Sequence, residues 1–200
     1  MLSGASPRIL EHDFPKIYTH EGHKIADIDD DRRIMLVHSG TVDAEGIKET
    51  FATIADSNFT DRNIPGTIHN RVIDDEKSFI LYIIDDNKQV LCGCNLMHGT
   101  FLEEPNEEYF YIYDLCTEYT HHRQGLAKAL LEGLFNFTQS TGVIKWLWLT
   151  VDTQKNNGVP AKTLVQIYKR HRYKIFTGSP VDNNDHLIPM RRRASAGGDG

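Results

Sequence analysis

The most informative stretch of this sequence is Asp114-Leu115-Cys116-Thr117-Glu118-Tyr119-Thr120-His121-His122-Arg123-Gln124-Gly125-Leu126-Ala127. An apolar strand stops within it, a polar turn follows, and Gly125 lies where an apolar-periodic helix begins. Glycine permits close backbone approach to a ligand, and the alanine two residues later adds almost no bulk. The first N–H groups of a helix lack partners within it, so they can hold an anion such as a pyrophosphate. The spacing alone does not distinguish such an anion site from a strand–turn–helix in which the glycine only serves packing.

Strand and helix patterns alternate on both sides of this stretch. Strands are predicted at residues 34–37, 79–84, 90–94, 109–117, 146–151, 173–176 and 187–190. Helices are predicted from about Thr41, from Gln124 to Gly142, and from Pro160 to His171. Antiparallel strands therefore come first, and a strand–helix–strand–helix unit follows. This order predicts an α+β fold with a mixed, mainly antiparallel twisted sheet flanked by helices.

The two ends of the chain differ in composition from the part between them. Residues 1–32 are rich in Asp, His and Pro, which predicts a poorly packed arm with room for one added strand. Residues 191–200 begin with three arginines and continue with Gly, Ala, Ser and Asp, so we expect a disordered tail. The arginines fit a solvated strand end better than a nucleic-acid patch. One domain is expected over residues 33–190.

Composition narrows the class of protein. The chain has 200 residues, with Lys+Arg 22 against Asp+Glu 28 and a formal net charge of −6. A mildly acidic protein lacks the basic field that nucleic-acid binding needs, and no apolar run approaches the roughly 20 residues that span a bilayer. Of the three cysteines, Cys92 and Cys94 alternate in a strand and should share one face. We expect all three thiols to be buried in an intracellular, cytoplasmic protein, with no metal site.

Two segments resemble the GNAT superfamily of N-acetyltransferases. His122-Arg123-Gln124-Gly125-Leu126-Ala127 is similar to its Gln/Arg-x-x-Gly-x-Gly/Ala motif, and Ile167-Tyr168-Lys169-Arg170-His171-Arg172-Tyr173 is similar to its Leu-Tyr-x-x-x-Gly-Phe. The order of elements from about Arg33 to Met190 is also similar to that fold. The resemblance implies acetyl-CoA as cosubstrate. It implies that the backbone of one strand pairs with the pantetheine arm, and that the turn and helix start hold the pyrophosphate. The implied residues are Leu115, Cys116, Thr117, His122, Arg123, Gln124, Gly125, Leu126, Ala127 and Lys128.

The resemblance also implies direct attack of a primary amine on the thioester. Tyr168 is placed by the motif to protonate the CoA sulfur, although a position one turn beyond Leu164 also suits a core aromatic. Asp114 interrupts an apolar strand, where a buried carboxylate is costly unless it has a partner or a function. It can bind or deprotonate the amine, or be a salt-bridged edge residue, and Glu118 is the reserve base. Cys116 is expected to pack rather than to carry an acyl group.

The acceptor is the least constrained part of the prediction. Asp114 and Tyr168-Lys169-Arg170 are similar to the equivalent stretches of spermidine/spermine acetyltransferases, so a small cationic amine such as a polyamine is the leading hypothesis. An acidic cluster can attract such an amine or a lysine-rich peptide, or be a solvated loop; it comprises Glu103, Glu104, Glu107 and Glu108. The alternatives are a protein lysine or N-terminal acetyltransferase, and a CoA-binding regulatory module without turnover. Departures from the motifs at His122, Arg172 and Ala161 keep the regulatory module as an alternative. A homodimer is a further possibility.

Overall fold

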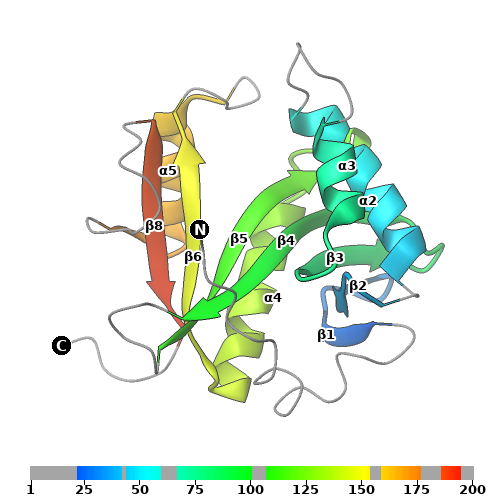
Figure 1. Cartoon of the computed structure of the whole chain (residues 1–200), viewed down its shortest axis with the longest axis horizontal. Helices are drawn as coiled ribbons and strands as arrows, with labels where there is room; N and C mark the ends of the chain where they lie inside the picture. The colour runs from blue at the N-terminus through cyan, green and yellow to red at the C-terminus, as the bar shows by residue number, and fades with distance from the viewer. Residues whose placement is uncertain are drawn as a thin grey trace.

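One eight-stranded sheet organises the computed structural model, with strand order β1-β2-β3-β4-β5-β6-β8-β7 (Figure 1). The strands are β1 His23–Asp27, β2 Arg32–His38, β3 Phe79–Asp85, β4 Val90–Thr100, β5 Glu108–Thr117, β6 Ile144–Asp152, β7 Lys174–Ile175 and β8 Leu187–Arg193. The helices are α2 Ala44–Phe59, α3 Thr67–Asp74, the 3-10 turn η1 Tyr119–His121, α4 Leu126–Thr141 and α5 Ala161–Arg170. The structure describes residues 22–41, 44–59, 67–100, 107–153, 159–176 and 186–194.

Pairing within the sheet is antiparallel except between β5 and β6. These two strands run parallel from Glu108↔Ile144 to Ile112↔Leu149, and beyond that register they separate (Figure 1). The mixed, mainly antiparallel α+β fold predicted from the sequence is therefore confirmed. The helix at Thr67–Asp74 was not among the predicted elements.

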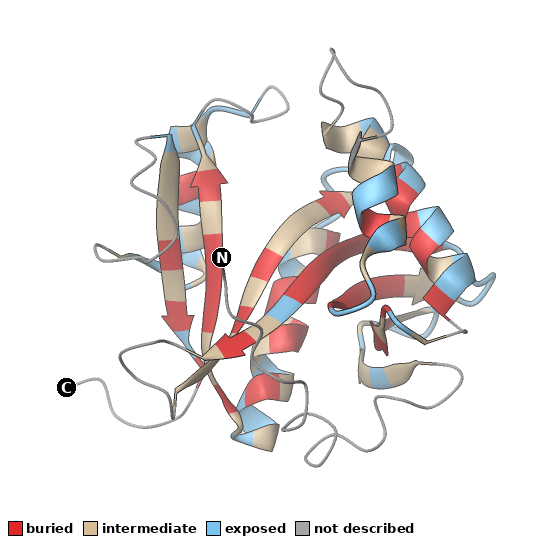
Figure 2. Ribbon diagram, in the orientation of Figure 1, coloured by how far each residue is buried: buried red, intermediate tan, exposed pale blue. Residues whose placement is uncertain are grey.

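Strand side chains divide between two cores, one on each face of the sheet. Helices α4 and α5 pack on one face, and α2 and α3 pack on the other (Figures 1 and 2). Leu81 and Ile83 belong to the α4/α5 core, whereas Ile80 belongs to the α2/α3 core. Cys92 and Cys94 both lie in the α4/α5 core, as their spacing predicted. The alternation shows that β3 and β4 are covered on both sides.

Both predicted chain ends can be compared with the structure where it is described. Strand β1 pairs antiparallel with β2 and is the one added strand for which the prediction left room in residues 1–32. Residues 1–21 lie outside the described part. The tail boundary at 191 is wrong, because β8 continues to Arg193 and pairs with β6. Side-chain contacts hold the arginines in place. Arg191 lies over the Trp146 ring at 4.2 Å, and Arg192 is only 5 % exposed.

Candidate active site

A bulge in β5 marks the place where β5 leaves β6. Gly93 pairs with Cys116 and Asn95 pairs with Tyr113, so Asp114 and Leu115 together face the single residue between Gly93 and Asn95 on β4. Asp114 takes a left-handed backbone conformation with φ of 52°, which Asp adopts more readily than most residues. A bulge bends its strand and increases its twist. The parallel pairing of β5 with β6 accordingly ends before the bulge.

The Asp114 carboxylate is held from two elements. Arg71 of α3 forms an ion pair with it, and the Asn95 side-chain amide of β4 donates a hydrogen bond at 3.1 Å. The Asp114 side chain is 11 % exposed, whereas that of Arg71 is 53 % exposed. Asp114 thus has the salt bridge that one interpretation expected, at a position next to the strand separation. Its role as a base stays a prediction.

A second acidic group lies beside the bulge. The Tyr113 hydroxyl donates a hydrogen bond to Asp75 Oδ2 at 2.8 Å, in the segment that joins α3 to β3. Partial burial alone would raise the pKa of Asp75, but hydrogen bonds from Lys77, Tyr113 and Ser78 hold it below its usual value. Sequence reasoning missed Arg71, Asp75 and Asn95. No local pattern marks them, because their contacts join residues 19 to 43 positions apart.

The predicted acid lies on the other face of the sheet. Tyr168 of α5 packs against the α4/α5 core, edge-on to Tyr173 with ring centroids 5.9 Å apart. Burial, together with the Cys94 thiol, raises the pKa of Tyr168 to about 12. Cys94 is the β4 residue that lies opposite the bulge. Tyr168 thus packs against the α4/α5 core, whereas the Asp114 carboxylate is paired with Arg71 of α3, and the catalytic roles of both stay predictions.

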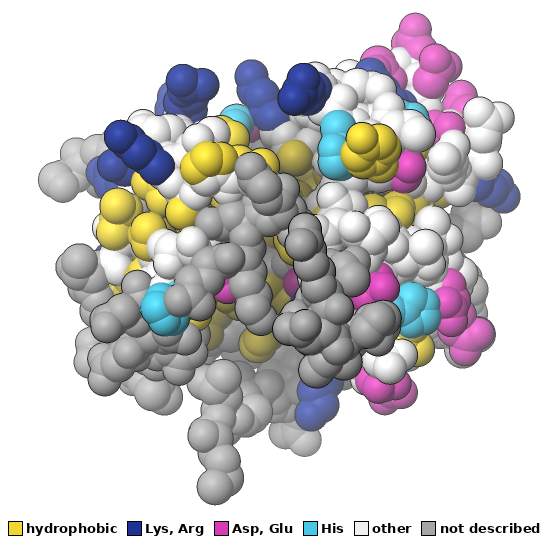
Figure 3. Space-filling model, turned by 90° about the horizontal axis from the view of Figure 1, so that it is seen from above, with side chains coloured by type: hydrophobic (Ala, Val, Ile, Leu, Met, Phe, Trp, Pro, Cys, Tyr) yellow, Lys and Arg dark blue, Asp and Glu magenta, His cyan; other side chains and the backbone are white. Residues whose placement is uncertain are grey.

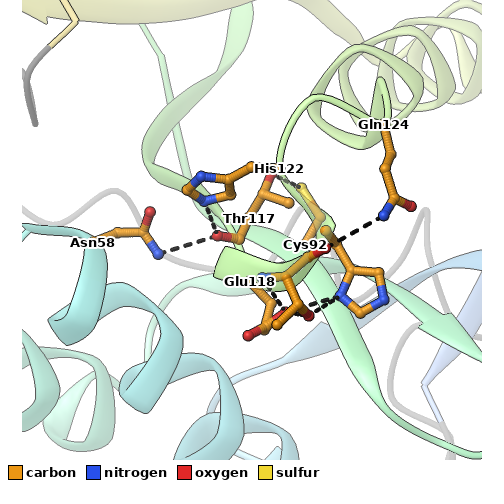
Figure 4. A network of polar contacts seen from close by, with 8 residues as sticks. Asn58, Cys92, Thr117, Glu118, His122 and Gln124 are labelled. Carbon is orange, nitrogen blue, oxygen red and sulfur yellow. Dashed lines mark hydrogen bonds and ion pairs between the residues drawn. The ribbon is translucent and has the colours of Figure 1, made fainter.

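The turn after β5 is fixed by side-chain hydrogen bonds (Figure 4). Glu118 accepts hydrogen bonds from the Thr120 N–H at 2.9 Å and the His121 ring at 2.8 Å, so it caps η1. The hydrogen bond from the Thr120 side chain is the main reason why the pKa of Glu118 is lowered. The reserve base is thus engaged in holding the turn.

The Thr117 carbonyl at the end of β5 is already occupied (Figure 4). Asn58 Nδ2 at the end of α2 donates to it at 3.1 Å, and His122 Nε2 lies 2.9 Å away. A carbonyl oxygen only accepts, so this nitrogen of His122 carries the hydrogen. Two donors fill the two lone pairs of the oxygen. Of the backbone implied for the pantetheine arm, Leu115 and Cys116 therefore remain the better candidates.

The start of α4 has the form expected of an anion site. Gly125 precedes it with φ of 79°, and space for 4 Å around its missing Cβ is open. The Ala129 N–H is bonded back to the Gly125 carbonyl at 3.0 Å, and the three N–H groups before it, from Leu126 to Lys128, come too early in the helix for such a bond. Arg123 also has a positive φ, 63°. Arg123, Gln124 and Lys128 are exposed, Ala127 is half-buried, and Leu126 is anchored in the core.

The motif departures have structural explanations where they are described. Arg172 takes the left-handed position after α5 with φ of 63°, and its N–H still bonds to the Lys169 carbonyl at 3.0 Å. The turn expected of a glycine therefore forms without one. Ala161 is the first residue of α5. Asn156 and Asn157 lie outside the described residues, as do Glu103 and Glu104. Glu107 bonds to the Trp146 indole and Glu108 to His98, so these two acidic residues are paired.

Other candidate chemistry is limited in the described ranges. Cys92, Cys94 and Cys116 are free and buried, and burial is the main cause of the raised pKa of each thiol. Cys116 packs in the α2/α3 core, as predicted. In this part of the chain no group of three His, Cys, Asp or Glu residues is arranged to hold a metal ion. Nor does any helix described here have the length and apolar character needed to cross a membrane.

Comparison with known proteins places this geometry in a family. The profile of the Acetyltransferase (GNAT) family matches residues 46–171, more than half of the chain. No curated protein sequence matches. An acyl-CoA N-acyltransferase from Pseudomonas aeruginosa superposes with a TM-score of 0.56 at 14% identity, over 80% of this chain and 99% of that one.

Two further solved structures share the fold. The ribosomal-protein-S18-alanine N-acetyltransferase from Escherichia coli has a TM-score of 0.53 at 17% identity, covering 84% of this chain and 97% of its own. An aminoglycoside 6'-N-acetyltransferase complexed with coenzyme A has a TM-score of 0.56 at 12% identity, covering 77% and 94%. Identities this low establish the fold alone. Together with the family profile, they show that the chain belongs to the GNAT acetyltransferase family of acyl-CoA-dependent N-acyltransferases.

Proposed function

We propose that this enzyme moves an acetyl group from acetyl-CoA to a small cationic primary amine, such as a polyamine, by direct attack of the amine on the thioester. The observation that carries the proposal is the β5 bulge at Asp114. There the Asp114 carboxylate lies where β5 leaves β6, and β5 continues through η1 to the N–H groups at the start of α4 that have no partner within the helix. A carboxylate and a candidate donor site thus lie along one continuous segment of the chain, and the family motif adds Tyr168 of α5 as the candidate proton donor.

The residues present fit acetyl-CoA as cosubstrate. The open space at Gly125 and the free N–H groups from Leu126 to Lys128 suit a pyrophosphate. His122, Arg123 and Gln124 form the turn before it, and the backbone of Leu115 and Cys116 is suited to pair with the pantetheine arm. When bound, acetyl-CoA supplies an activated acyl group. A backbone N–H at the bulge can polarise its carbonyl.

Protons have a source and a destination in this arrangement. Tyr168 Oη holds its proton at neutral pH because its pKa is raised to about 12, so it can give that proton to a leaving thiolate. The Asp114 carboxylate can bind the ammonium group of the acceptor, or take a proton from it directly or through water. Arg71 covers Asp114 from an exposed position, so an incoming cation can exchange with it.

Charge favours a cationic acceptor. Asp75 and Asp114 flank the bulge on the α3 side, and the whole chain carries a formal net charge of −6. An acidic approach raises the local concentration of a cationic substrate. Solved relatives carry the names of an aminoglycoside and of a ribosomal-protein alanine acetyltransferase. A protein lysine or N-terminal acceptor is therefore the second candidate, and a CoA-binding module without turnover is the third.

The test is release of free thiol from acetyl-CoA by the full chain, against polyamines, amino acids, arylalkylamines and lysine peptides. We expect release with polyamines and saturation in both substrates. Transfer to peptides but not to free amines supports the protein acetyltransferase. Thermal stabilisation by acetyl-CoA without thiol release supports the binding module. If acetyl-CoA gives no thermal stabilisation and no thiol is released, the proposed donor site itself is contradicted.

A further inference from the structure

A groove runs between α4 and the end of α5, outside the path described above. It has a volume of about 620 Å³, and its walls come from α4 between Lys128 and Phe135, from the last turn of α5 with the two residues after it, and from one residue of β8. Its charged lining residues are Lys128, Glu132, Arg170, His171, Arg172 and Arg192. Lys128 lies on the first turn of α4, next to the proposed pyrophosphate amides. The groove therefore continues from the donor site along the outside of the helix.

Among the described residues that line the groove, one carboxylate is present, and it is neutralised internally. Glu132 accepts a hydrogen bond from His171 Nδ1 at 2.8 Å, and Arg192 donates to its two oxygens at 3.1 and 3.3 Å. Partial burial would raise the pKa of Glu132, but these two partners hold it below its usual value. Arg192 is 5 % exposed, and its Nε has no hydrogen-bond partner within the described structure. Arg192 and His171 together therefore compensate the negative charge of Glu132.

The remaining cations of the groove are exposed. Lys128, Arg170 and Arg172 form no ion pair among the described residues. Viewed from above, Lys and Arg side chains gather along the edge of the molecule that carries α4 and α5, although the chain as a whole is acidic (Figure 3). The groove is therefore locally cationic.

Arg172 adds an observation of a different kind. Its φ of 63° is strained for any residue with a Cβ, and a glycine would relieve that strain. The chain instead places a guanidinium there, on the wall of the groove. A strained backbone that persists at such a position is consistent with a use for its side chain.

We propose that this groove binds a phosphomonoester dianion through Lys128, Arg170 and Arg172, with Arg192 behind them compensating the charge of Glu132. Guanidinium groups match phosphate oxygens with paired N–H donors. Two sources can supply this group. One is the 3'-phosphate of the cosubstrate itself, in which case the inference rests on the proposed function. The other is a separate phosphate.

The experiment is calorimetric titration of the full chain with CoA and with 3'-dephospho-CoA. The wild type should bind CoA about tenfold more tightly, as expected for charge-assisted hydrogen bonds to a dianion. Arg170→Gln and Arg172→Gln should lose most of this preference while binding 3'-dephospho-CoA as before. Lys169→Gln changes the neighbouring exposed lysine, which lies outside the groove, and should keep the preference. Arg172→Gly relieves the backbone strain, so its loss of preference cannot come from misfolding.

Titration with inorganic phosphate separates the two sources. If the 3'-phosphate occupies the groove, phosphate binds beside 3'-dephospho-CoA and CoA excludes it. If the source is separate, CoA and 3'-dephospho-CoA bind equally, and phosphate binds with either present but not to Arg172→Gln. Equal binding of both coenzymes without any phosphate binding overturns the inference and leaves the proposed function intact. Failure to bind either coenzyme refutes the proposed function, whereas phosphate binding to the free chain still decides the groove.

Discussion

The two sides of the β5 bulge are built in different ways. On the α4 side, the groups suited to the donor are backbone N–H groups and a turn of consecutive residues, from Thr117 to Lys128. On the α3 side, the groups suited to the acceptor are side chains brought together from separate elements, as in the contacts of Asp114 with Arg71 and Asn95. A backbone site follows from local sequence, while a side-chain site depends on the packing of distant segments. The donor side should therefore tolerate changes of side chain better than the acceptor side.

Removal of the Tyr168 hydroxyl should have the largest effect, because every turnover needs the proton that it is proposed to give to the leaving thiolate. Tyr168→Phe should lower kcat by about 100-fold or more, as expected for loss of a general acid, with little change in either KM. Since the acid form is lost only above a pKa of about 12, the wild-type rate should show no fall due to Tyr168 between pH 8 and 10. Steady-state rates across this pH range provide the measurement.

Tyr173→Phe is the matched control for that change. The Tyr173 hydroxyl is buried next to Tyr168 and has no hydrogen-bond partner within the described structure. Its removal should leave kcat unchanged. An equal loss in both variants would mean that Tyr168 acts through packing of the core and not through its proton.

Asp114→Asn should produce the next largest effect, confined to the acceptor side. We expect kcat/KM for the amine to fall about tenfold, since the neutral amide neither attracts a cation nor takes a proton. The KM for acetyl-CoA should stay unchanged. Arg71→Gln should preserve or raise the rate by freeing the carboxylate. If Arg71→Gln is as damaging as Asp114→Asn, the ion pair is structural and the base lies elsewhere.

Gly125→Ala tests the donor side by backbone conformation. Its φ of 79° disfavours any Cβ, although nothing lies within 4 Å of where that Cβ would be. We expect about 1 kcal/mol less stability and a rise of about fivefold in the KM for acetyl-CoA as the helix start shifts. Gly142→Ala places the same strain at the other end of α4, with φ of 70° and equally open space. Urea denaturation should show similar losses for both variants, and a KM that rises in both would contradict the placement of the pyrophosphate.

His122→Ala should have the smallest effect, because it removes one hydrogen bond that supports the turn. We expect the free energy of unfolding to fall by about 1 kcal/mol, which is about the net contribution of a single hydrogen bond. The KM for acetyl-CoA should rise about two- to threefold. The amide of His122→Gln can still donate to the Thr117 carbonyl, so this variant should behave as wild type. A decrease in kcat with unchanged KM would instead assign His122 to the chemistry.

Sequence patterns predicted the strands and helices wherever apolar periodicity was strong, and the cap at Gly142 illustrates why. A helix with Leu126, Leu130 and Leu134 on one side must bury that side, and a following glycine can take the left-handed conformation that ends it. The helix α3 is only eight residues long, and its apolar residues that pack on the α2/α3 core are three, Ile68, Val72 and Ile73, so it gave no comparable signal. The tail boundary failed because Arg192 is ordered by contacts with Glu132 and Phe135, which lie about 60 positions earlier.

By itself, the sequence determined the α+β fold and the strand–turn–helix at Gly125, because both depend on neighbouring residues or on regular spacing. Its resemblance to the family's motifs gave the turn as the predicted donor site and Tyr168 as the predicted acid. Only the tertiary structure revealed that β5 bulges at Asp114, that Arg71 and Asn95 hold that carboxylate, and that α4 and α5 enclose a cationic groove. These features arise where segments far apart in the chain pack together. A pairwise contact at long range leaves no periodic trace in one sequence, so it became visible only when the sheet and its helices were assembled.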